Sequence, residues 1–217
     1  MGIGQVTAAP RVAILDRDGT LIDVVRDEET GAITVAFHPD QIRLLGGVVE
    51  GLSALKEAGF LLAIATNQPG PAKGQCSAAA VRRTNDALVA MLAASGLPVA
   101  VVKTCMHHPD GGPGGDRGLV GPCRCRKPKP GMLEDILRET GADAAASWMI
   151  GDSSADLDAA RAASVGSALV FATNRCELCP LRNGPDGSPD VHGPTLADVA
   201  GQIAAFTLRS RPSREAR

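Results

Sequence analysis

The stretch Val12-Ala13-Ile14-Leu15-Asp16-Arg17-Asp18-Gly19-Thr20 decides the fold that we predict for this chain. Its four apolar residues predict a buried strand, and the glycine predicts a tight turn just beyond it. Asp16 and Asp18 follow the strand, and residues two apart project to the same side of an extended backbone. The two carboxylates can therefore approach one phosphoryl group and one Mg²⁺ together, as a nucleophile and its acid/base partner would.

A calcium-binding loop or an ordinary acidic turn is the alternative interpretation of these residues. An EF-hand loop carries oxygen ligands at alternate positions and a glycine at the sixth. Counted from Asp16, the fifth residue is Thr20 and the sixth is Leu21, so the calcium loop does not fit. The acidic turn stays open on these residues alone.

Strand-like and helix-like segments alternate along the chain. Buried strands are predicted at residues 12–15, 61–65, 99–102, 148–150 and 168–171. Apolar residues at helical spacing lie between most of these runs and after the last one: Val81, Leu88 and Leu92; Leu133, Ile136 and Leu137; Leu196, Val199, Ile203 and Phe206. This alternation predicts an α/β fold, a Rossmann-like three-layer sandwich with a mostly parallel sheet. Ligands of such sheets bind at the carboxyl ends of the strands.

Length and composition favour one globular domain. The chain has 217 residues, of which 44% are hydrophobic, and a net charge of −2. We expect an N-terminal extension at 1–10, one domain at 11–207 and a basic tail at 208–217, with the Gly/Pro-rich stretches 111–122 and 183–194 as loops. No apolar run approaches the ~18 residues of a membrane span, and the start lacks the layout of a signal peptide. A cytoplasmic monomer without membrane or nucleic-acid partners is therefore expected.

Further polar residues follow the second and fourth predicted strands. Thr66 and Asn67 follow the run 61–65, and their hydroxyl and backbone N–H groups can hold phosphoryl oxygens. Asp152 follows the strand that ends at Ile150, where a carboxylate would be an oxygen ligand for Mg²⁺, and Asp156 either supports that site or starts the next helix. On its own, the Thr66 motif is better explained as a capping threonine in a turn, and helix capping by Asp152 or Ser153 explains the later motif equally well.

A basic run, Arg126-Lys127-Pro128-Lys129-Pro130-Gly131, lies just before a predicted helix. A cation at that point can neutralise the charge that develops on a phosphate. A solvated basic loop is the commoner explanation of such a run in isolation.

Taken in order, these motifs resemble the haloacid dehalogenase (HAD) superfamily of phosphatases. The resemblance covers residues 12–171 and implies a phosphoaspartyl mechanism in which Asp16 is the nucleophile and Asp18 the general acid/base. It also implies Mg²⁺ bound by Asp16, the backbone carbonyl of Asp18, and Asp152. The substrate- and phosphate-binding residues that it implies are Asp16, Asp18, Thr20, Thr66, Asn67, Lys73, Arg126 and Lys127.

A second signal is a set of one histidine and three cysteines, Cys105, His107, Cys123 and Cys125. Two close pairs bridged by a Gly/Pro-rich loop can form a tetrahedral Cys₃His zinc site, and the metal would close a loop that has little apolar material. Spacing favours His107 over His108 as the ligand. Disulfides are the alternative, which a cytoplasmic chain disfavours. We predict a structural zinc in loop 105–125.

The zinc loop narrows the resemblance to the branch that contains histidinol phosphatases and heptose-bisphosphate phosphatases, whose members lack a large cap domain. The chain is most similar to the D-glycero-D-manno-heptose 1,7-bisphosphate 7-phosphatases, which implies a small-molecule sugar bisphosphate as substrate. Three features depart from that pattern: Pro69 and Pro71 change the shape of the loop that carries Lys73, Ser153 stands where a basic residue is common, and the segment 24–37 is longer than usual. Histidinol phosphate or another small sugar phosphate is the enzymatic alternative, and a zinc-containing binding module is the remote one. Cys176 and Cys179 are expected to be free thiols or a weak accessory metal site.

Overall fold

The computed structural model describes residues 9–26, 29, 31–171 and 188–209. Cys176 and Cys179 lie outside this part of the chain. The strands are β1 (Arg11–Leu15), β2 (Val25–Arg26), β3 (Ile33–Thr34), β4 (Phe60–Asn67), β5 (Val99–Cys105), β6 (Trp148–Gly151), β7 (Gly166–Val170) and β8 (Val191–Gly193). The α-helices are α1 (Val48–Glu57), α2 (Ala78–Ala94), α3 (Gly131–Thr140), α4 (Ser154–Ala162) and α5 (Leu196–Arg209). Short 3₁₀ turns span Pro39–Gln41, Arg117–Leu119 and Ala144–Ala146.

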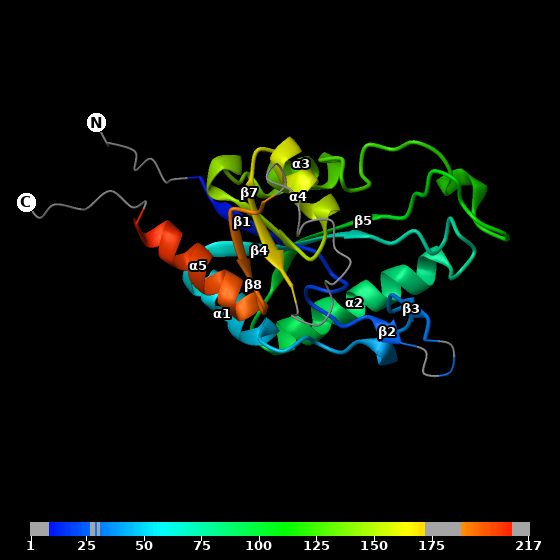
Figure 1. Cartoon of the computed structure of the whole chain (residues 1–217), viewed down its shortest axis with the longest axis horizontal. Helices are drawn as coiled ribbons and strands as arrows, with labels where there is room; N and C mark the ends of the chain where they lie inside the picture. The colour runs from blue at the N-terminus through cyan, green and yellow to red at the C-terminus, as the bar shows by residue number, and fades with distance from the viewer. Residues whose placement is uncertain (1–8, 27–28, 30, 172–187, 210–217) are drawn as a thin grey trace, which may run out of the picture.

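Six strands form one parallel sheet in the order β5-β4-β1-β6-β7-β8. Helices α1, α2 and α5 cover one face, and α3 and α4 cover the other (Figure 1). This arrangement confirms the predicted three-layer α/β sandwich. No helix in the described ranges is long and apolar enough to cross a bilayer.

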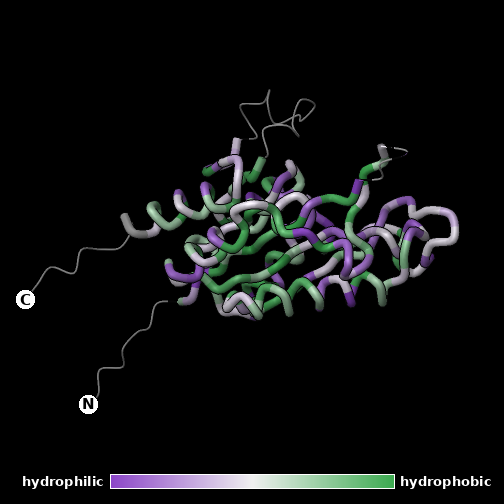
Figure 2. Tube along the Cα trace, turned by 90° about the horizontal axis from the view of Figure 1, so that it is seen from below, coloured by the Kyte–Doolittle hydropathy of each residue, from purple (hydrophilic) through white to green (hydrophobic). Residues whose placement is uncertain are grey.

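The core lies on both faces of the sheet, and β1 contributes to each by strict alternation. Ala13 and Leu15 belong to the cluster that packs against α1, α2 and α5, whereas Val12 and Ile14 belong to the cluster under α3 and α4. A central strand buried on both faces needs a continuous apolar run, which the sequence of β1 supplies. Figure 2 shows hydrophobic stretches of the chain running through the middle of the molecule.

The structure corrects one sequence expectation and qualifies another. The stretch 183–194 was expected to be a loop, but its residues Val191–Gly193 form the edge strand β8, which pairs with β7. Three residues are too few to give a strand periodicity, so tertiary pairing decides this element. Phe206 shares the predicted helix face but is 60% exposed, and its ring meets Trp148 edge to face at 5.9 Å.

The fold brings the motif-bearing strand ends to one edge. The chain runs outward from β1 through β4 to β5, then returns to β6 on the other side of β1. Such a reversal leaves a crevice at the carboxyl ends of the central strands, where ligands bind in open α/β sheets. Beside this edge, β2 and β3 form a small antiparallel hairpin within the segment 24–37.

Candidate active site

Asp16 and Asp152 stand on two neighbouring strand ends. Asp16 follows β1, and its N–H donates to the Ile150 carbonyl of β6 at 2.9 Å. The turn after Asp16 passes so close to Asp152 that a Cβ on Gly19 would lie 2.0 Å from its Oδ2 atom. Gly19 also has a φ of +85°, which favours glycine. The glycine therefore allows the turn after β1 and the Asp152 carboxylate to meet.

Lys127 is a buried cation at this edge of the sheet. Its Nζ donates to Asp16 Oδ1 at 2.8 Å and to the Ala65 carbonyl at 2.7 Å, and forms an ion pair with Asp156 Oδ1 at 2.6 Å. Asp156 is fully buried and caps α4, where its Oδ2 atom accepts from the N–H and the hydroxyl of Ser153. Asp156 thus both begins the helix and holds the lysine, the two roles that its position in the sequence left open.

Burial and charge shift the ionisation of these groups. Burial is the main cause that raises the pKa of Asp16 to about 6, against the lowering effect of Lys127. Burial together with Asp16 and Asp156 raises the pKa of Asp152 to about 7. Burial alone would lower the pKa of Lys127, but the carboxylates of Asp16 and Asp156 raise it above its ordinary value. The site therefore holds more acidic groups than its one buried lysine neutralises.

The surplus of carboxylates fits a hard divalent cation. Oxygens of Asp16, Asp152 and Asp156 lie within 4.8 Å of one another. Asp156 already bonds Lys127 and Ser153 with its two oxygens, so Asp16 and Asp152 are the carboxylates with capacity for a metal. Carboxylate oxygens are the ligands that Mg²⁺ prefers.

Asp18 is held by a network of buried side chains that also reaches Thr66. Both of its oxygens accept from the Arg17 guanidinium at 3.0 Å, and Oδ2 also accepts from Gln68 Nε2 at 2.6 Å. Arg17 is fully buried and reaches Asn85 Oδ1 at 2.9 Å and the Ala36 carbonyl at 3.0 Å. Sequence reasoning missed Arg17 and Gln68. For Arg17, the available signal was its place between Asp16 and Asp18, where a charged residue can bond a neighbouring carboxylate.

The residues after β4 have distinct positions. Thr66 is buried, and its hydroxyl accepts from Gln68 Nε2 at 2.8 Å. The Asn67 side chain bonds the backbone of Lys127. Thr20 is fully buried on the turn after β1, and neither its hydroxyl nor Gln68 Oε1 has a partner among the described residues. Thr20 and Thr66 therefore place two buried hydroxyl groups at the ends of β1 and β4.

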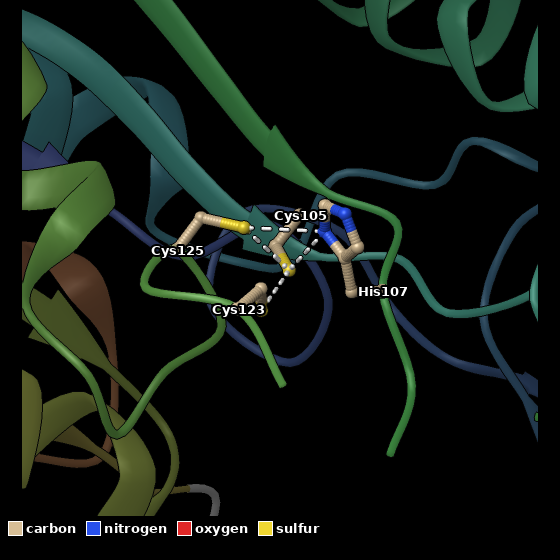
Figure 3. Close-up of side chains that lie close together, drawn as sticks. All are labelled: Cys105, His107, Cys123 and Cys125. Carbon is tan, nitrogen blue, oxygen red and sulfur yellow. Dashed lines mark hydrogen bonds between the residues drawn. The ribbon is translucent and has the colours of Figure 1, made fainter. Parts of the chain in front are cut away.

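The four predicted zinc ligands come together at the end of β5 (Figure 3). Cys105 Sγ lies 3.8 Å from Cys123 Sγ, 3.7 Å from His107 Nδ1 and 3.1 Å from Cys125 Sγ, and Cys125 Sγ lies 3.4 Å from His107 Nδ1. Zn–S bonds of about 2.3 Å in a tetrahedron place sulfur atoms about 3.8 Å apart. The donor set and most of these spacings therefore fit a Cys₃His zinc site. We call residues 105–125 the Cys/His clip.

Three other basic residues, His108, Arg126 and Lys73, lie in or beside the clip. His108 is not in the cluster, and its Nδ1 accepts from the N–H groups of Asp110 and Gly111. Arg126 is half-buried, and its Nη1 donates to the His107 carbonyl at 3.4 Å. Lys73 lies on a turn that packs backbone to backbone against the clip, where a Cβ on Gly112 would lie 2.6 Å from the Lys73 carbonyl oxygen.

Comparisons with known proteins identify the same family that the motifs resemble. A profile of the HAD-hydrolase-like family matches residues 124–198. The D-glycero-beta-D-manno-heptose-1,7-bisphosphate 7-phosphatase of Yersinia pestis is 32% identical over 200 residues, which cover 92% of this chain and 98% of that protein. The protein of the same name from Escherichia coli strain K12 is 34% identical over 189 residues, with 87% and 91% covered.

Solved structures agree with the sequence relatives. The crystal structure of D,D-heptose 1,7-bisphosphate phosphatase from B. bronchiseptica, complexed with magnesium and phosphate, has a TM-score of 0.71 at 32% identity and covers 90% of this chain and 99% of that one. A HAD-like phosphatase from Mesorhizobium loti has a TM-score of 0.69 at 25% identity, with 95% and 90% covered. This chain therefore belongs to the D-glycero-beta-D-manno-heptose-1,7-bisphosphate 7-phosphatase family, a family of phosphoric monoester hydrolases with the HAD fold.

Proposed function

We propose that this chain removes the 7-phosphate of D-glycero-D-manno-heptose 1,7-bisphosphate through a phosphoaspartyl intermediate, in the synthesis of nucleotide-activated heptose. The observation that carries the mechanism is the 2.8 Å contact between Lys127 Nζ and Asp16 Oδ1 at the sheet's switch point. A cation at that distance neutralises charge on the nucleophile and on the incoming phosphoryl group. The relatives at 32–36% identity support the substrate.

The reaction has two halves. The Asp16 carboxylate attacks phosphorus and forms a new P–O bond, while the bond to the sugar oxygen breaks and Asp18 gives that oxygen its proton. Asp18 then takes a proton from the water that hydrolyses the aspartyl phosphate, which releases phosphate and regenerates Asp16. Thr20, Thr66 and Lys127 hold the phosphoryl oxygens.

Two metals complete the proposal. Asp16, the backbone carbonyl of Asp18, and Asp152 would bind Mg²⁺, which supplies further positive charge to the phosphoryl group when it is bound. Cys105, His107, Cys123 and Cys125 would bind a structural zinc. Four protein ligands leave no open coordination position on it, so it serves folding rather than chemistry.

Specificity is assigned to Arg126, which directly follows the clip, and to Lys73 on the neighbouring turn. Together with Lys127 they supply more positive charge than one phosphate requires, which favours a bisphosphate over a substrate with an amine. We infer a monomeric enzyme that acts in the cytoplasm on this small molecule, with no nucleic-acid or membrane partner. Size-exclusion chromatography checks the monomer.

The test compares kcat/KM for heptose 1,7-bisphosphate and histidinol phosphate, with both sugar anomers. We expect the bisphosphate to be preferred, and Arg126→Ala to reduce that preference more than it slows a monophosphate. Arg124→Ala is the matched control, because this exposed clip arginine bonds Glu134 and Asp135 on α3 instead. A wild-type preference for histidinol phosphate would refute the proposed substrate and leave the phosphoaspartyl mechanism standing.

A further inference from the structure

We propose that Asn67 is a positioning residue that acts on the reaction through Lys127 and joins the Cys/His clip to the catalytic edge. The proposal rests on the role given above to Lys127 as the cation of phosphoryl transfer. It differs from the sequence expectation, in which Asn67 itself binds phosphate.

The Asn67 side chain makes a reciprocal pair of hydrogen bonds with one peptide unit on each side of Lys127. Its Nδ2 donates to the Lys127 carbonyl at 3.0 Å, and its Oδ1 accepts from the Lys127 N–H at 3.1 Å. An amide bonded to both the N–H and the C=O of one residue fixes that residue's backbone much as a neighbouring strand would. The Asn67 side chain therefore holds the backbone of Lys127 in place from the end of β4.

The same residue also meets the other end of the clip. Asn67 is the register partner of Cys105 across β4 and β5, and the next N–H, that of Gln68, donates to the Cys105 carbonyl at 2.7 Å. Cys105 begins the clip, and Cys125 ends it two residues before Lys127. Both ends of the clip are thus attached to the end of β4. Cys105 is held by sheet pairing, and the segment after Cys125 is held by the hydrogen bonds between the Asn67 amide and Lys127.

Lys127 needs such an anchor because its chemistry depends on the position of Nζ. Its side chain is nearly fully buried, and Nζ lies between Asp16, Asp156 and the Ala65 carbonyl. The Lys127 backbone itself lies in the loop between the clip and α3, outside the sheet. A shift of about 1 Å in such a group can cost about 10²-fold in rate.

The pair with Lys127 limits how the Asn67 side chain could bind phosphate. It uses one N–H of Nδ2 and one lone pair of Oδ1 and fixes the plane of the amide, so only the second N–H is left to donate to a ligand. Asn67 is half-buried at the strand end, so removal of its amide leaves the core packing of β4 intact.

The test is a double-mutant cycle read with p-nitrophenyl phosphate, whose turnover reports phosphoryl transfer whatever the natural sugar is. Asn67→Ala should lower kcat by about 10- to 100-fold, with a smaller change in KM and with zinc content and melting temperature retained. In the Lys127→Ala background the same substitution should have almost no further effect, because the residue it positions is absent. Lys127→Arg provides a second background that keeps a positive charge if the alanine variant does not fold.

The matched control is Lys129→Met, which removes another side-chain hydrogen bond to the clip backbone, from Lys129 Nζ to the Cys123 carbonyl. It should leave the rate near the wild-type value. If Asn67→Ala lowered kcat equally in the wild-type and Lys127→Ala backgrounds, Asn67 would act on the substrate independently of Lys127, which would overturn the proposal. Loss of zinc with Asn67→Ala, or a loss of rate no greater than that of the control, would do the same. Poor turnover of the heptose bisphosphate by the wild type would count against the substrate alone.

Discussion

The guanidinium of Arg17 donates hydrogen bonds to both carboxylate oxygens of Asp18, from Nε to Oδ2 and from Nη2 to Oδ1, each 3.0 Å long. The arginine has no exposed surface, and its other donors reach Asn85 of α2 and the Ala36 carbonyl. Because Asn85 and the Ala36 carbonyl fix the planar guanidinium, its two bonds to Asp18 permit one orientation of that carboxylate. The side chain proposed as the general acid/base is therefore oriented by its own neighbour in the chain.

Arg17→Lys should impair the step that depends on Asp18. The ammonium keeps the charge but cannot bond both oxygens, so we expect kcat on a sugar phosphate to fall by about 10- to 100-fold. An aryl phosphate, whose leaving group needs no proton, should be affected less. The measurement is the ratio of the two rates, with the melting temperature as the control for folding. An equal loss on both substrates would argue that Arg17 serves only the fold.

Asp16→Asn should abolish turnover without unfolding the protein. An amide cannot form the aspartyl phosphate, and removal of one charge relieves the repulsion among the carboxylates around Lys127. Asp18→Asn should also be severely slowed, by about 10²- to 10⁴-fold. Steady-state rates with circular dichroism as the folding control test both. A near-native rate for the Asp16 variant would exclude the phosphoaspartyl mechanism.

Gly19→Ala should disrupt the site by displacing Asp152. The added methyl would lie 2.0 Å from Asp152 Oδ2, at a backbone φ of +85°. Gly141→Ala is the control, because Gly141 also has a positive φ, +64°, but nothing lies within 4 Å of its missing Cβ. Both variants carry backbone strain of about 1–2 kcal/mol. We expect only the Gly19 variant to lose affinity for Mg²⁺ and activity. Similar Mg²⁺ titrations for the two would contradict this reading of the turn.

Stability without Mg²⁺ should fall as the pH rises from about 4 to about 7. The folded pKa values of Asp16, about 6, and Asp152, about 7, lie above the ordinary value of 3.8, so the folded state holds protons that the unfolded state has lost. Above that window both carboxylates are charged and repel each other, and Mg²⁺ should then stabilise most. Melting temperatures with and without Mg²⁺ at about pH 5 and pH 8 test this. A Mg²⁺ effect independent of pH would contradict the assignment.

Zinc should be structural and separate from the catalytic metal. Metal analysis of fresh, reduced protein should find about one zinc per chain. Cys123→Ser should lose it, loosen residues 105–125 to proteolysis and weaken substrate binding through Arg126 and Lys127, while Mg²⁺ still binds at Asp16 and Asp152. Fully active protein that contains no zinc would refute the site.

Local residue order was enough to predict the sheet, its layers and the edge that carries the motifs. A two-sided apolar run such as Val12–Leu15 is compatible with little other than a central strand, and the polar residues directly after such runs must lie at the strand ends. The four clip residues were predictable for a similar reason, because their spacing within one loop limits how they can meet.

Contacts between distant segments were decided only by the tertiary structure. The sequence does not state that Asn67 bonds Lys127, 60 positions away, or that Arg17 turns inward to Asn85, because such pairs depend on how separate strands and helices pack. The formation of the edge strand β8 likewise depends on its pairing with β7. Sequence by itself determined which groups follow the predicted strands, since the positions of those strands along the chain follow from local patterning. The tertiary structure alone determined which of those groups touch, since hydrogen-bond geometry is set across the fold rather than along the chain.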